Sequence, residues 1–99
     1  MEKIVVHVDS DLEDLIPGYL ENRRQDVEAI LRALENKDFE AIRVLGHTMK
    51  GTGGSYGFEL ITDLGRALEK AARDLDEASV KQSAVSLRDY IQAVEVVFQ

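Results

Sequence analysis

The stretch from residue 46 to residue 57 carries the side chains best suited to chemistry. It reads Gly-His-Thr-Met-Lys-Gly-Thr-Gly-Gly-Ser-Tyr-Gly, so His47 stands three residues before Lys50 among several glycines. An imidazole with an unperturbed pKa of about 6.5 is mostly neutral near pH 7. Its free nitrogen can attack phosphorus, and a lysine one helical turn away can offset part of a phosphoryl charge. The alternative interpretation is a solvated histidine beside an ordinary surface lysine.

Helical geometry predicts that His47 faces solvent. Successive residues advance by about 100° around a helix. We place the buried side of this helix at Ile42, Leu45 and Met49. His47 then points away from the core, and the residues expected to share its exposed face are Arg43, Lys50, Gly51 and Gly54.

The glycines allow two interpretations, which the sequence leaves open. Glycine in a helix interior destabilises by about 0.5–1 kcal/mol relative to alanine. Close approach of another group to His47 would explain glycines inside the helix, with Gly51 leaving the imidazole uncovered. Alternatively the helix ends at Gly51 as a C-terminal cap, and the run to Gly57 is a loop.

Other chemistries that use these residue types do not fit the spacing. A dinucleotide fingerprint would need glycine where Tyr56 stands, and a P-loop would need lysine where Thr52 stands. The chain has no cysteine, which excludes a thiolate nucleophile and a zinc–cysteine site. His7 is expected to be solvated, and neither histidine follows a glutamate by three residues as in a di-iron bundle.

Apolar periodicity predicts the elements that position His47. Pro17 should interrupt the first helical segment. A short helix is predicted at residues 11–16. The long helices are predicted at 17–35, from Phe39 onward, at about 58–75 and at about 79–98. Such helices pack most simply as an all-α, antiparallel up-down four-helix bundle. We expect one domain over 1–99, with an extended segment at 1–9 and the helical bundle at 10–99.

Several local expectations accompany these elements. Ser10 with Glu13 fits a capping box, and Asp38 is expected to cap the following helix. The apolar side of the third long helix should include Leu75, whereas the pair Glu69-Lys70 is expected to be solvated. The β-branched segment 3–8 can be extended, but a lone strand has no partner.

Charge and composition narrow the classes of partner. Acidic residues outnumber basic residues by 19 to 12, which gives a net charge of -7 over 99 residues. Such a surface disfavours nucleic acid and anionic membranes. Since there is no run of about 18 apolar residues and no signal-peptide core, we expect a cytoplasmic location.

The pattern His47-x-x-Lys50-Gly51-x5-Gly57 resembles the signature of the histidine-phosphotransfer (HPt) family. The apolar residues that follow, from Phe58 to Ala72, are similar to the next helix of that family. The resemblance is detailed over residues 39–75. Gly46, where the family usually has alanine, and the additional glycine at 53–54 depart from the pattern but keep the residues small.

The resemblance implies that His47 is the phosphoacceptor, through its Nε2 nitrogen, and that Lys50 is the cation near the phosphoryl group. It implies that Gly51 keeps the imidazole accessible and that Gly57 marks the turn into the next helix. The implied partner is a receiver domain of a response regulator or hybrid histidine kinase, with its own aspartate and Mg²⁺. Candidate docking residues are Arg43, Gly46, Lys50, Gly54 and Tyr56, although Tyr56 suits a core or loop position better.

We therefore expect a phosphocarrier of two-component signalling that is not itself an enzyme. It should need no cofactor or metal of its own. The sequence leaves the oligomeric state open, although it favours a monomer. Two alternatives stay open: a helical adaptor without phosphoryl chemistry, and the phosphoacceptor domain of a chemotaxis-type histidine kinase.

Overall fold

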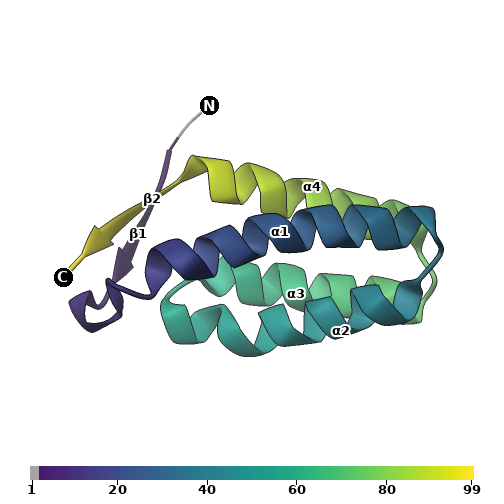
Figure 1. Cartoon of the computed structure of the whole chain (residues 1–99), viewed down its shortest axis with the longest axis horizontal. Coiled ribbons are helices and arrows are strands. Elements are labelled where there is room, and N and C mark those ends of the chain that lie inside the picture. Colours follow the sequence, from purple (N-terminus) through teal and green to yellow (C-terminus); the bar gives the residue numbers. More distant parts are fainter. Residues whose placement is uncertain (1–2) are drawn as a thin grey trace.

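The computed structural model describes residues 3–99, which form a helical bundle with a small sheet at one end (Figure 1). The elements in chain order are β1 (Ile4–Val8), the 3-10 turn η1 (Ser10–Leu12), α1 (Ile16–Glu35), α2 (Phe39–Thr52), the 3-10 turn η2 (Gly54–Tyr56), α3 (Glu59–Arg73), α4 (Glu77–Ala93) and β2 (Val94–Phe98). Residues 1–2, part of the extended segment expected at 1–9, lie outside the described residues.

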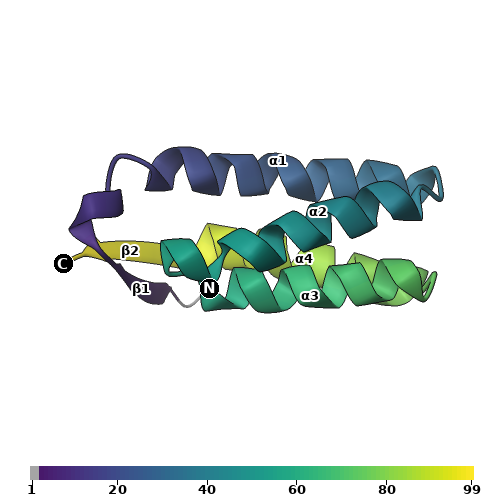
Figure 2. The same ribbon diagram turned by 90° about the horizontal axis from the view of Figure 1, so that it is seen from below.

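The four long helices pack side by side with their axes nearly aligned (Figures 1 and 2). In the described chain, α2 packs most extensively against α3, and α1 contacts both α2 and α4. Short turns connect consecutive helices at alternating ends, so the predicted all-α four-helix bundle is confirmed. The fully buried side chains between the helices include Ile30, Ile42, Met49, Phe58, Ile61, Leu68 and Leu87.

The starts of the helices follow the local sequence. Asp38 accepts a hydrogen bond from the backbone nitrogen of Ala41 at 3.1 Å, so the predicted cap of α2 is confirmed. Pro17 lies in the first turn of α1, where its missing N–H has no intrahelical partner to lose. The predicted capping box at Ser10 is wrong, because Asp9 caps η1 instead.

The C-terminal segment corrects two expectations. The fourth helix ends at Ala93 rather than continuing to residue 98, and residues 94–98 form β2. This strand pairs in parallel with β1, with Ile4 opposite Val94 and Val8 opposite Phe98. Segment 3–8 is therefore extended as expected, but it has the partner that the sequence did not reveal.

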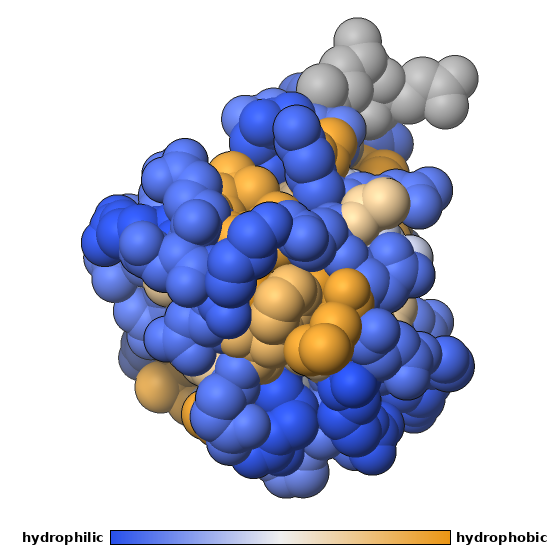
Figure 3. Space-filling view, turned by 90° about the vertical axis from the view of Figure 1, so that its right-hand side faces the viewer, coloured by the Kyte–Doolittle hydropathy of each residue, from blue (hydrophilic) through white to orange (hydrophobic). Residues whose placement is uncertain are grey.

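The turn after α3 places Leu75 differently from the prediction. Leu75 is 65% exposed and has a positive φ of 55°. The backbone nitrogen of Asp76 donates to the carbonyl of Ala71 at 2.9 Å, as in a helix-terminating turn. This reversal carries the leucine off the buried side of α3. Figure 3 views this end and shows apolar side chains gathered at its centre.

The described helices also bear on membrane insertion. Over residues 3–99, none of them is both long enough and apolar enough to cross a lipid bilayer.

Candidate functional site

His47 projects from the exposed side of α2, as predicted. Its side chain is 66% exposed, whereas Ile42 and Met49 on the opposite side are fully buried. The helix continues through Gly51 to Thr52, so the alternative that it ends at Gly51 is wrong. A Cβ at Gly51 would meet no atom within 4 Å, which leaves open space one turn beyond the imidazole.

Other glycines bring α2 and α3 into close contact. A Cβ at Gly46 would lie 2.8 Å from the backbone nitrogen of Glu69, and a Cβ at Gly53 would lie 2.5 Å from that of Thr62. On the facing helix, a Cβ at Gly65 would lie 2.5 Å from the backbone nitrogen of Lys50. Gly46 is therefore buried between the helices rather than part of a docking surface, which corrects the prediction. Sequence reasoning did not single out Gly65.

The close contact brings Glu69 of α3 beside His47. The Oε2 atom of Glu69 lies 2.9 Å from Nδ1 of His47, and its Oε1 atom accepts from Nζ of Lys50 at 2.7 Å. The side chain of Glu69 is only 8% exposed. The expectation that Glu69 belongs to a solvated face is therefore wrong, although its neighbour Lys70 is exposed as expected. The sequence signal that could have indicated this burial is that Glu69 directly follows Leu68, a residue on the apolar side of the helix.

The charges and hydrogen bonds of Glu69, Lys50 and His47 determine which ring nitrogen of His47 carries no proton. The hydrogen bond from Lys50, followed by the one from His47, lowers the pKa of Glu69 to about 2. An ionised carboxylate can only accept hydrogen bonds. Nδ1 of His47 is therefore assigned as the protonated donor, and Nε2 of the neutral ring keeps its lone pair. Within residues 3–99, no hydrogen bond engages Nε2.

The remaining predicted site residues lie around this cluster at differing depths. Arg43 is paired with Glu40, with its NH2 nitrogen 2.6 Å from Oε1. A Cβ at Gly54 would meet the carboxylate of Glu59 at 3.2 Å, so Gly54 lies beside α3. Their docking roles stay predictions.

Gly57 and Tyr56 form the turn that leads into α3. Gly57 has a φ of 92°, a conformation that favours glycine, in the turn where it was expected. Tyr56 stacks on Tyr19 of α1 with the ring centroids 4.4 Å apart, so the core or loop interpretation of this residue is the better one.

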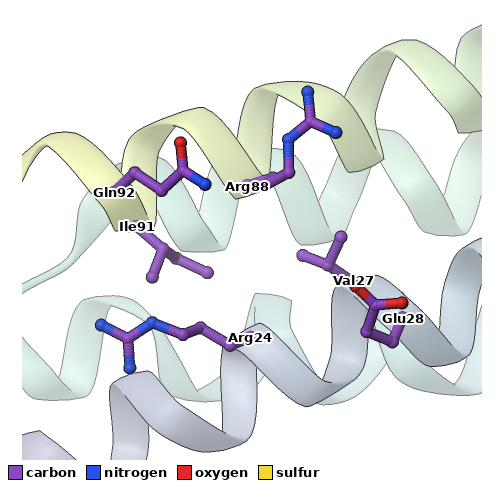
Figure 4. A pocket seen from close by; sticks show the side chains of 6 residues that line it. All are labelled: Arg24, Val27, Glu28, Arg88, Ile91 and Gln92. Atoms are coloured by element: carbon purple, nitrogen blue, oxygen red, sulfur yellow. The ribbon is translucent and has the colours of Figure 1, made fainter. Parts of the chain in front are cut away.

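A groove on the other side of the bundle does not contribute to this site. It lies between α1 and α4, has a volume of about 200 Å³, and is lined by Arg24, Val27, Glu28, Arg88, Ile91 and Gln92 (Figure 4). It contains neither His47 nor Glu69. Residues 3–99 also hold no group of three or more histidine, aspartate or glutamate residues arranged to bind a metal ion. The cluster of His47, Lys50 and Glu69 thus lies on α2 and α3, outside this groove.

Comparison with known proteins agrees with this geometry. The family model described as Hpt domain matches residues 14–96, which cover all four helices. Neither the curated proteins nor the solved structures give a match. The chain therefore belongs to the Hpt domain family, whose members have a histidine phosphotransfer role in phosphorelays.

Proposed function

We propose that Nε2 of His47 accepts a phosphoryl group from, or returns it to, an aspartate of a receiver domain. The observation that carries this proposal is the contact of Glu69 with Nδ1 at 2.9 Å, on a side chain that is otherwise 66% exposed. The contact orients the ring and leaves the other nitrogen as the nucleophile. Family membership supports the same class of reaction.

The proposed step is an in-line displacement at phosphorus. The Nε2 lone pair forms a P–N bond while the P–O bond to the aspartyl carboxylate breaks, and that carboxylate leaves with the electron pair. In the reverse direction the aspartate attacks and the imidazole leaves. The carboxylate of Glu69 stabilises the positive charge that develops on the ring during attack.

Lys50 is proposed to assist from the same cluster. Its ammonium group is 2.7 Å from Oε1 of Glu69, the same carboxylate that contacts His47, and its side chain is 34% exposed and therefore not enclosed. It can contact phosphoryl oxygens once they are attached to Nε2. Mg²⁺ and most of the electrostatic stabilisation are expected on the receiver, which makes this chain a phosphocarrier rather than an enzyme.

The proposed docking surface is the exposed side of α2 around His47. Gly51 leaves open space there, and Arg43 borders it. Val44, one turn before His47, is 50% exposed and adds an apolar contact that sequence reasoning missed. A surface with small, apolar and basic residues suits a partner that must approach the imidazole closely.

The test is transfer from a phosphorylated receiver domain. The chain is incubated with receivers carrying ³²P, and the label on it is examined for stability in base and lability in acid. Wild-type protein and His7→Gln should acquire such label, whereas His47→Gln should acquire none and keep its helical circular dichroism. Label that persists in His47→Gln contradicts the proposal. Receiver binding without label in the wild type would instead indicate an adaptor.

A further inference from the structure

The outer face of the β1–β2 pair is an exposed patch that the proposed function does not use. The strands extend past the helices at one end of the bundle (Figures 1 and 2). In the parallel register, Val5 lies opposite Glu95, and His7 lies opposite Val97. Opposite residues of a sheet share a face, and these four are all exposed. The inner face packs against the bundle through Val6, Val8, Val94, Val96 and Phe98.

A sheet of this kind is stabilised when both of its faces are covered. Parallel strands are normally buried on both sides, and a sheet of only two strands is marginal in water. Here one face is covered, while Val5 is 53% exposed and Val97 is 40% exposed. Burial of these valines against another apolar surface would therefore be favourable.

The patch is complementary to itself. The two valines occupy one diagonal, and His7 and Glu95 occupy the other. When two copies face each other, a two-fold axis in the plane between the sheets, along the line from Val5 to Val97, places each valine over the same valine of the second copy. The same axis brings Glu95 of each copy toward His7 of the other. An axis along the polar diagonal would instead place Glu95 on Glu95, which like-charge repulsion disfavours. Of these two arrangements, the charges favour the one along the valine diagonal, in which the contact is the same patch on both copies.

Lys3 strengthens this pattern at the edge of the patch. Its Nζ atom lies 3.9 Å from the Oε2 atom of Glu95 in the same chain. In the paired arrangement, each Glu95 would lie between Lys3 of its own chain and His7 of the second copy. Each Glu95 is thus flanked by an ammonium group and an imidazole rather than by a second carboxylate.

We propose that the outer face of β1 and β2 binds a second copy of this chain and forms a weak two-fold dimer. The patch has four residues per copy, well below the roughly 800 Å² per partner of stable complexes. We therefore expect association only at high concentration, with a Kd of about 0.1–1 mM. The proposal uses none of the side chains in the cluster of His47, Lys50 and Glu69 and does not depend on the phosphotransfer function.

Sedimentation equilibrium of the full chain over a range of concentrations tests the dimer. The average mass should rise from 11.1 kDa toward twice that value. Val97→Lys should weaken association by roughly tenfold or more, because two buried valines are lost from a symmetric contact. Leu60→Lys, at a residue of α3 that is 42% exposed, is the matched control and should not change association.

A charge exchange tests the symmetric arrangement itself. His7→Glu and Glu95→Lys should each weaken association, and the double variant should restore it. An average mass that stays at 11.1 kDa at every concentration overturns the proposal. Association that Val97→Lys leaves unchanged also overturns it, since pairing through the open strand edges would behave in that way.

Discussion

The spacing between α2 and α3 depends on Gly65, and alanine at this position is the most informative substitution. The added Cβ would lie 2.5 Å from the backbone nitrogen of Lys50, 2.7 Å from the carbonyl oxygen of Gly46 and 2.9 Å from Cβ of Met49. Two of these atoms are backbone and cannot rotate away. The helices must therefore separate.

The cost can be estimated from opposing effects. Overpacking of this kind costs typically about 1–3 kcal/mol, and three contacts below 3 Å place Gly65→Ala near the upper limit. Alanine recovers about 1 kcal/mol of helix propensity. The free energy of unfolding should therefore fall by about 2 kcal/mol. With an m-value of about 1 kcal/mol/M, the urea midpoint falls by roughly 2 M.

Urea titration monitored by far-ultraviolet circular dichroism measures this change. Gly18→Ala in α1 is the matched control, because a Cβ there would meet nothing within 4 Å. It should raise stability by up to about 1 kcal/mol. Separation of the helices should also move Glu69 from His47 and slow phosphotransfer. If Gly65→Ala and Gly18→Ala prove equally stable, the close-contact reasoning is refuted.

Three further predictions concern the site and one turn. Glu69→Gln should shift the His47 proton from Nδ1 toward Nε2 in ¹⁵N NMR spectra and slow transfer by roughly ten- to hundredfold, the range found for carboxylates that orient metal-binding histidines; unchanged ring nitrogen shifts would contradict the assigned tautomer. Gly51→Leu should slow transfer by covering the imidazole while the chain stays folded, and unchanged kinetics would mean that the open space has no role. Leu75→Gly should raise the free energy of unfolding by about 1 kcal/mol, because glycine adopts the positive φ without strain; a lower urea midpoint would show that the exposed leucine stabilises the fold.

Local sequence was sufficient for the features that depend on neighbours along the chain. The helical period placed His47 on the side of α2 opposite Ile42 and Met49. In the structure His47 is exposed and the two apolar residues are buried, as predicted. Asp38 could be recognised as a cap because its acceptor serves a backbone nitrogen three residues away. These features need only the geometry of a single helix, so the exposed histidine and the four-helix bundle could be predicted without tertiary contacts.

Tertiary structure decided the features that join distant segments. Glu69 lies 22 residues from His47, and its contact depends on how closely α2 and α3 approach at their glycines. Likewise Val94 begins a strand rather than another helical turn, because β1, some ninety residues earlier by the register, offers a row of backbone partners. A pattern within one segment cannot encode the distance to another, so the contact of Glu69 with His47 and the paired strands became visible only in the folded chain.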